Sequence, residues 1–278
     1  MTVKCRFWGG NKMKKISLVL VVVLMAAAMI FTGCSSDSAE GDILKIGVDD
    51  SYPPMEYRDE NNELVGFDIA LAKALGEKLE MEVEFISTAF DGIFQGLETQ
   101  NYDIIMSSVS ITPKRLETFL FSEPYLSNGQ VIVVKPGDDS VKTPEDLDGK
   151  TVGVQLGTTA DSAVQKYMED LDIELIKYDE IIQTFSAMKA GYVDYIVVDY
   201  PVAIEYVGND PDNFEISSAQ LTNEPIGVCI RKEDVELKEK IDKALSELRE
   251  EGTLAEISVE WLKDDYTSNI DTELKVIE

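Results

Sequence analysis

Hydrophobic residues recur along this chain at two spacings, which predict strands and helices in turn. Residues 43–48 form a short apolar run with β-branched residues, which is typical of a buried strand. Phe67, Leu71, Leu75 and Leu79 then recur every four residues, so they lie on one face of a helix. Strands that alternate with helices of this length are typical of an α/β fold with mostly parallel sheets.

The same alternation continues to residue 262. It predicts further strands at residues 82–85, 104–106, 131–134, 152–154, 173–178 and 195–198. It predicts a helix capped by Asp91, and further helices at residues 159–168, 180–190 and 233–262, the last interrupted at Gly252.

Polar residues come directly after four of these strands. The four segments are residues 49–52, 107–110, 157–159 and 199–201. Sheets of this kind bind ligands outside the carboxyl ends of their strands. We therefore expect the four segments to form one convergent site.

The composition narrows the chemistry of that site. The 278-residue chain has 25 Lys and Arg against 53 Asp and Glu, a net charge of −28, which argues against nucleic-acid binding. Histidine is absent, which excludes His-based triads and His–zinc sites, and we expect no metal. Gly47, Gly153 and Gly157 form neither a GxGxxG nor a Walker motif, so we expect no nucleotide or other cofactor.

Residues 1–33 are predicted to be a signal peptide. Five basic residues precede an apolar run at residues 16–31, which is shorter than the roughly 20 residues that span a bilayer. The small residues before Cys34 resemble the lipobox of bacterial lipoproteins, which implies that Cys34 is lipidated and that residues 34–41 are a tether. The alternatives are an uncleaved membrane helix with Cys34 unmodified, and a start at Met13 instead of Met1.

The mature chain would then hold one other cysteine, Cys229. It lies in an apolar run, residues 226–230, that is predicted to be a buried strand. If Cys34 is acylated, Cys229 has no partner for a disulfide. We interpret Cys229 as a small core residue and not a reactive thiol.

Several candidate site residues suit the two ends of an α-amino acid. The guanidinium of Arg115 matches a carboxylate with two hydrogen bonds, and residues 157–159 open a helix whose N-terminus favours an anion. Asp199 at a strand end can hold an ammonium group, and Tyr52 and Phe90 can flank a side chain. The structural alternatives are a surface arginine for Arg115, helix caps for residues 157–159 and for Asp199, and core aromatics for Tyr52 and Phe90. Together they favour a site for a free α-amino acid.

Several stretches, in this order, resemble the family 3 extracellular solute-binding proteins, the polar amino acid receptors of ABC importers. The similarity covers about residues 43–264. Its motifs lie at residues 47–54, 66–69, 102–115, 121–125, 152–159, 194–199, 248–254 and 261–262.

The resemblance implies an α/β fold of two lobes, the type II periplasmic-binding-protein fold, joined by two crossing strands. Lobe 1 would be residues 42–128 and 228–278, and lobe 2 residues 129–227. The lobes close on the ligand, and the closed monomer delivers it to ABC permease subunits. The protein would be exported, anchored by its lipid to the outer face of the cell membrane or periplasmic, and would not be an enzyme.

The resemblance also implies roles for individual residues. The α-carboxylate would be bound by Arg115 and by the backbone N–H groups of Ser110 and Thr159. The α-ammonium would be bound by Asp199, the Ser108 hydroxyl and the Ser107 carbonyl. Around the side chain would lie Tyr52, Phe90, Asp49 and Gln155.

Asp49 suits a cationic ligand side chain and Gln155 a polar one, so lysine, arginine, histidine or glutamine are the leading ligands. Cystine and neutral amino acids stay open, since Met55 stands where many relatives have Phe. Two rival functions are a cyclohexadienyl-dehydratase-like enzyme on the same fold and an amino acid sensor that acts through a membrane receptor. Asp199 is of the ammonium-binding type, which argues against the enzyme.

Overall fold

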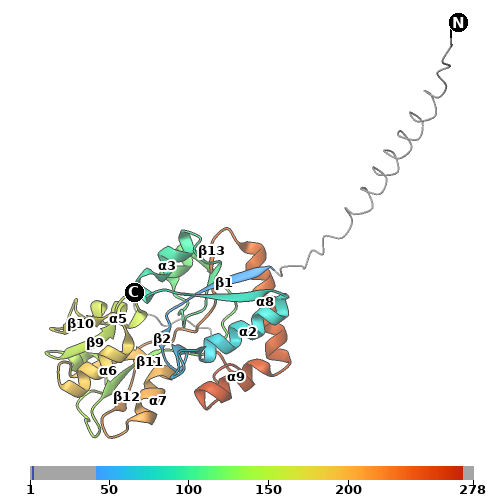
Figure 1. Cartoon of the computed structure of the whole chain (residues 1–278). Helices are drawn as coiled ribbons and strands as arrows, with labels where there is room; N and C mark the ends of the chain where they lie inside the picture. Colours follow the sequence, from blue (N-terminus) through green and yellow to red (C-terminus); the bar gives the residue numbers. More distant parts are fainter. Residues whose placement is uncertain (1, 3–41, 272–278) are drawn as a thin grey trace. The chain divides into compact units, whose positions relative to one another are not determined.

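The computed structural model describes residue 2 and residues 42–271. Apart from residue 2, the predicted signal peptide at residues 1–33 lies outside the described residues, as do the whole tether at residues 34–41, which includes Cys34, and residues 272–278. Within the described part, two five-stranded sheets and one three-stranded sheet form, and helices pack on both faces of the larger sheets (Figure 1). The two larger sheets are the centres of two lobes.

The first sheet has the strand order β5-β1-β6-β13-β7. Its strands are β1 (Ile43–Val48), β5 (Glu82–Ser87), β6 (Ile104–Ile105), β7 (Phe119–Phe121) and β13 (Cys229–Arg231). The helices around it are α2 (Phe67–Leu79), α3 (Phe90–Glu98), α4 (Pro113–Thr118), α8 (Val235–Glu250) and α9 (Thr253–Leu262). Helices α2, α8 and α9 pack on one another on one side of the sheet (Figure 1).

The second sheet has the order β10-β9-β11-β8-β12. Its strands are β8 (Gln130–Val134), β9 (Thr151–Gln155), β10 (Glu174–Tyr178), β11 (Tyr195–Asp199) and β12 (Glu215–Gln220). The helices of this lobe are η1 (Pro144–Leu147), α5 (Thr159–Tyr167), α6 (Ile181–Ala190) and α7 (Tyr200–Asn209). A small antiparallel sheet of β2 (Ser51–Tyr52), β3 (Glu56–Arg58) and β4 (Leu64–Val65) follows β1.

Both larger sheets are mostly parallel, as the sequence predicts. In each sheet one strand runs against the others: β13 in the first and β8 in the second. Each is the strand that the chain enters on crossing from the other sheet. The two crossing segments, residues 122–129 and 221–228, run antiparallel and hydrogen-bond to each other, for example through Ile226 N and Leu126 O.

Most predicted elements are confirmed, including the interruption at Gly252, which has a φ of +83° between α8 and α9. Cys229 is buried and free, as predicted. The predicted cap at Asp91 is wrong. Helix α3 starts two residues earlier, with Ala89 at the N-cap, so Asp91 lies inside the first turn, where a negative charge suits the helix dipole.

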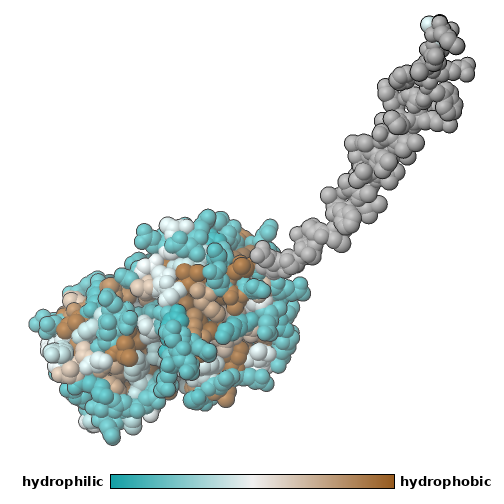
Figure 2. All heavy atoms as spheres, viewed as in Figure 1, coloured by the Kyte–Doolittle hydropathy of each residue, from teal (hydrophilic) through white to brown (hydrophobic). Residues whose placement is uncertain are grey.

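The visible face of the two lobes is mostly hydrophilic, with hydrophobic residues in patches between the charged ones (Figure 2). No helix among residues 42–271 has the length and apolar character needed to cross a bilayer.

Candidate functional site

Most of the predicted site residues line one small pocket between the lobes, the inner pocket. It is lined by Tyr52, Phe90, Ser108, Ser110, Arg115, Gln155, Thr158, Thr159 and Asp199. The space inside it is about 10 Å³, which is room for about one water molecule. The other two predicted residues, Asp49 and Ser107, lie beside this pocket, bonded to residues of its wall.

Asp199 ends strand β11 and points into the inner pocket. Its Oδ2 accepts a 2.6 Å hydrogen bond from Tyr52 Oη, and its Oδ1 accepts from Asn128 Nδ2 at 2.5 Å and Gln130 Nε2 at 2.6 Å. Burial raises the pKa of Asp199, while these donors and the nearby Arg115 lower it. Asp199 occupies the N-cap position of α7, but its side chain does not cap that helix. The capping alternative is therefore excluded.

Arg115 lies in the first turn of the short helix α4, which Thr112 caps. Its Nη1 donates to the carbonyl oxygen of Ser110 at 2.9 Å. Its Cζ lies 4.9 Å from the ring centre of Phe94 and 5.9 Å from that of Phe90, which is cation–π geometry. Burial lowers the pKa of Arg115, but an arginine guanidinium stays charged in proteins at neutral pH. The side chain is a fixed part of the cleft wall, not a surface arginine.

The N-terminus of α5 forms the opposite wall. The Thr158 hydroxyl caps the helix by accepting from Asp161 N at 3.2 Å, and Thr159 Oγ1 accepts from Gln130 Nε2 at 3.0 Å. Gly157 precedes the helix with a φ of +79°, and a Cβ there would lie 3.2 Å from Asp91 Cα in the other lobe. Glycine therefore permits both the left-handed turn and the close approach of the two lobes.

Asp49 links the lobes on the other side of the inner pocket. Its Oδ2 accepts from Gln155 Nε2 at 2.6 Å, and its Oδ1 accepts from Ser51 Oγ at 2.8 Å. Burial raises the pKa of Asp49, and the Ser51 and Gln155 donors lower it. The Asp49 N–H also donates to Ser107 Oγ at 2.9 Å, which ties the ends of β1 and β6 together.

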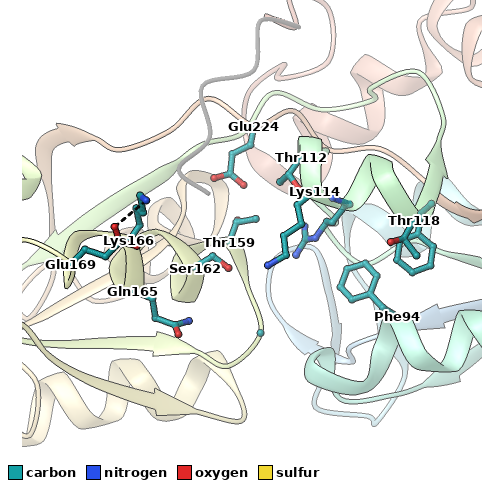
Figure 3. A pocket seen from close by; sticks show the side chains of 13 residues that line it. Phe94, Thr112, Lys114, Thr118, Thr159, Ser162, Gln165, Lys166, Glu169 and Glu224 are labelled. Atoms are coloured by element: carbon teal, nitrogen blue, oxygen red, sulfur yellow. Dashed lines mark hydrogen bonds and ion pairs between the residues drawn. The ribbon is translucent and has the colours of Figure 1, made fainter.

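A larger outer cavity of about 620 Å³ adjoins the inner pocket, and Arg115 and Thr159 line both. Ser162 and Gln165 lie on one side of it and Lys114 and Phe94 on the other, with Glu224 between them (Figure 3).

The sequence did not indicate several residues of the site. They are Glu56, Asp68, Phe94, Asn128, Gln130 and Glu224. Two sequence signals could have indicated some of these residues. Asp68 is an acid among apolar residues at the start of a predicted helix, and Gln130 is an amide directly before an apolar strand. Among residues 42–271, no group of three or more Cys, Asp and Glu is placed to hold a metal ion.

Two lobes around a cleft that carries a fixed guanidinium and a buried carboxylate define a solute-binding protein. The family model for bacterial extracellular solute-binding proteins, family 3, matches residues 44–264. The chain belongs to this family.

Relatives and solved structures similar to this chain are named as amino acid-binding proteins. The chain is 32% identical to the ABC transporter arginine-binding protein 1 of Escherichia coli K12, over 87% of this chain and 98% of that protein. An ancestral arginine-binding protein bound to arginine is 42% identical with a TM-score of 0.77, over 80% of this chain and 99% of that one. An ancestral amino acid-binding protein, a precursor of cyclohexadienyl dehydratase, is 35% identical with a TM-score of 0.74, over 79% and 95%.

The fold is therefore the type II periplasmic-binding-protein fold, and the protein captures an amino acid for an ABC importer outside the cytoplasm. The relatives are named as binding proteins, so the chain is a binding protein and not an enzyme.

Proposed function

We propose that the inner pocket binds a free basic L-amino acid, with L-arginine as the first candidate. Arg115 and the backbone N–H groups of Ser110 and Thr159 bind the α-carboxylate. The α-ammonium is bound by Asp199, the Ser108 hydroxyl and the Ser107 carbonyl. Tyr52 and Phe90 flank the side chain, and its distal end meets Asp49 and Gln155.

One observation carries the choice of a basic ligand: the cleft is rich in acceptors. Among the described residues, buried oxygens of Asn128, Gln130, Gln155 and Glu224 have no hydrogen-bond partner. Of these four residues, Gln155 lines the inner pocket and Glu224 the outer cavity. The Gln155 amide nitrogen faces the Asp49 carboxylate, which only accepts when ionised, so the Gln155 oxygen is the atom left for a ligand. A buried acceptor without a donor costs about 1–3 kcal/mol, so a donor-rich ligand is favoured.

The charges favour the same ligand. In or beside the inner pocket, Asp49 and Asp199 place two carboxyl groups against the guanidinium of Arg115. Glu224 lines the outer cavity, where Glu169, Lys114 and Lys166 also lie, so its charge is balanced there. A neutral zwitterion leaves this excess of acid uncompensated, whereas a ligand with a cationic side chain reduces it. The arginine-binding names of the relatives support the same class.

The test is a thermal-shift screen of the purified protein against the free L-amino acids, followed by calorimetry on the hits. We expect L-arginine, L-lysine or L-histidine to give the largest shift, since ligand at a hundred times its Kd adds about 2.7 kcal/mol of stability. A protein that binds only acidic or neutral amino acids would overturn the choice of ligand. A folded protein that binds no amino acid would overturn the function.

We also propose lobe boundaries and a closing motion. Lobe 1 comprises residues 42–128 and 228–278, and lobe 2 residues 129–227, with the crossing segments as the hinge. The inner pocket has room for about one water, so an amino acid enters only when the lobes separate. The monomer in its closed form then docks on the permease subunits.

A further proposal concerns membrane attachment: residues 1–33 are removed and Cys34 is lipidated. The basic, apolar and small-residue segments before Cys34 support it. The test is to fractionate cells that express the full chain and were grown with labelled palmitate. We expect labelled palmitate on the wild type and none on Cys34→Ser, with Cys229→Ser as the matched control. Label that persists in Cys34→Ser would contradict the proposal.

A further inference from the structure

Two fully buried acids lie behind the serines that we assign to the ligand ammonium. Glu56 on β3 and Asp68 at the start of α2 both have 0% exposure, and neither lines the inner pocket. The proposed binding roles leave both of them without a function. Buried carboxyl groups are costly unless they are hydrogen-bonded, so their contacts are informative.

Both acids accept hydrogen bonds from the turn that Ser107 and Ser108 form. Ser107 Oγ donates to Glu56 Oε1 at 2.8 Å, and Ser108 Oγ makes a longer 3.5 Å contact to Glu56 Oε2. Asp68 accepts from the Ser108 N–H at 2.7 Å and from Tyr125 Oη at 2.8 Å. Ser108 has a φ of +51°, a left-handed conformation that a non-glycine residue keeps only when its surroundings hold it.

These contacts decide where the serine protons point. A hydroxyl has one proton and two lone pairs. Ser107 gives its proton to Glu56 and accepts from the Asp49 N–H at 2.9 Å, so its hydroxyl is held by the protein beside the pocket. Ser108, which lines the inner pocket, points its proton along the longer contact to Glu56, so lone pairs of the Ser108 oxygen remain to face the pocket. An ammonium group, which has only donors, is matched, and a carboxylate or carbonyl oxygen is repelled.

The proton balance of the acid pair fits this arrangement. Burial raises the pKa of Asp68 to about 6 and raises the pKa of Glu56 well above its ordinary value, and the two acids hydrogen-bond to each other. Such a bond needs a proton on one of the two carboxyl groups, because two carboxylates can only accept. The remaining oxygen lone pairs of Glu56 stay free to accept from the serines.

We propose that Glu56, supported by Asp68, determines specificity for the ammonium end by fixing the Ser108 hydroxyl proton away from the ligand and by holding Ser107, whose carbonyl faces the ammonium, through its hydroxyl. Glu56 acts through the serines, so it is a positioning residue. This inference rests on the proposed function, because it assumes that an amino acid occupies the inner pocket.

The first test compares two substitutions with two probes, L-arginine and 5-guanidinopentanoate, which is arginine without its α-ammonium. Glu56→Gln keeps an acceptor for Ser107 and gives its amide N–H to Asp68, so L-arginine affinity should stay within about threefold. Glu56→Met has no acceptor, and L-arginine affinity should fall about 10- to 100-fold, the range for lost charge-assisted hydrogen bonds. Affinity for 5-guanidinopentanoate should change by less than about threefold in both.

The control is Glu60→Met, which changes an exposed acid in the same hairpin and should bind both probes as the wild type does. Equal loss of both probes in Glu56→Met, or a large loss in folded Glu56→Gln, would overturn the inference. Wild-type protein that binds no amino acid would instead overturn the proposed function.

A second test needs no variant. Neutron diffraction of the deuterated wild-type protein locates the two serine deuterons directly. We expect them on the lines from Ser107 Oγ and Ser108 Oγ to Glu56. Deuterons that point into the inner pocket would overturn the inference even if Glu56→Met fails to fold.

Discussion

Arg115 is oriented by the protein's own groups. The Ser110 carbonyl holds one nitrogen, and the Phe94 ring lies under the guanidinium plane. A side chain fixed in this way loses little conformational entropy when it binds a carboxylate, so more of the hydrogen-bond energy contributes to affinity.

We predict that Arg115→Ala lowers amino acid affinity by about 10- to 100-fold or more, because two charge-assisted hydrogen bonds are lost. The melting temperature should stay close to that of the wild type, since the side chain is only half-buried. Calorimetry measures the first and thermal unfolding the second. Arg58→Ala is the matched control: that arginine pairs with Asp50 at the surface and should leave affinity unchanged. Affinity of Arg115→Ala within about threefold of the wild type would contradict the assigned role.

At the scale of elements, the ring of Tyr102 positions helix α3. Tyr102, 1% exposed, fills the space between β1 and α3, where Gly47 and Gly96 face it. A Cβ at Gly96 would lie 2.2 Å from Tyr102 Oη, which is too close for any atom. Phe90 and Phe94 belong to this helix, so the Tyr102 contact also places the aromatic wall of the cleft.

We predict that Gly96→Ala lowers the free energy of unfolding by about 1–3 kcal/mol through overpacking. Gly92→Ala, in the same helix with open space around it, should raise it by about 0.5–1 kcal/mol because alanine favours helix. Urea unfolding measures both. Two substitutions of equal effect would show that the Tyr102 contact does not position the helix.

The start of α2 makes stability depend on pH. Burial raises the pKa of Asp68 from 3.8 to about 6, with Glu56 and Tyr125 facing it, so the folded state holds this proton more tightly than the unfolded state. The stabilisation is therefore full below pH 3.8 and is lost as the pH rises through about 6. The variant Asp68→Asn has an amide that does not titrate, so it lacks this pH dependence.

Between pH 4 and 7.5, wild type should lose up to roughly 3 kcal/mol of stability relative to Asp68→Asn. Denaturant unfolding across this range measures the difference. Parallel stability curves for the two proteins would mean that Asp68 does not carry this proton.

The sequence predicted the elements with a local signal and missed those without one. Helix α2 follows from the spacing of its apolar residues and strand β1 from its apolar run, and the strand ends supplied Asp49 and Asp199. Arg115 was predicted from its chemistry, because a guanidinium matches a carboxylate. The crossing segments have no such pattern, because their pairing joins residues about a hundred positions apart, as Leu126 and Ile226 do. Asn128, Gln130 and Glu224 lie on or directly after these segments, so their approach to the site could not be predicted.

At the scale of the whole molecule, two side-chain bonds join the lobes across the inner pocket: Tyr52 to Asp199 and Gln155 to Asp49, both 2.6 Å. Each involves a carboxylate and contributes about 1.5–3 kcal/mol. Together they favour the closed arrangement of the lobes.

We predict that the double variant Tyr52→Phe, Gln155→Leu shifts the population towards the open form, because neither new side chain can donate. Small-angle X-ray scattering without ligand should give a larger radius of gyration than for wild type. Tyr192→Phe, at an exposed tyrosine, is the control. An unchanged radius would show that these bonds do not hold the lobes together.

The central claim is that opposite charges in one cleft bind both ends of a single amino acid. Calorimetry of the wild-type protein with L-arginine, agmatine and 5-guanidinopentanoate tests it most directly, because the second probe lacks the carboxylate and the third the ammonium. We predict micromolar binding of L-arginine, about −8.2 kcal/mol, and at least about 100-fold weaker binding of both other probes. Either truncated probe binding within about tenfold of L-arginine would contradict the account.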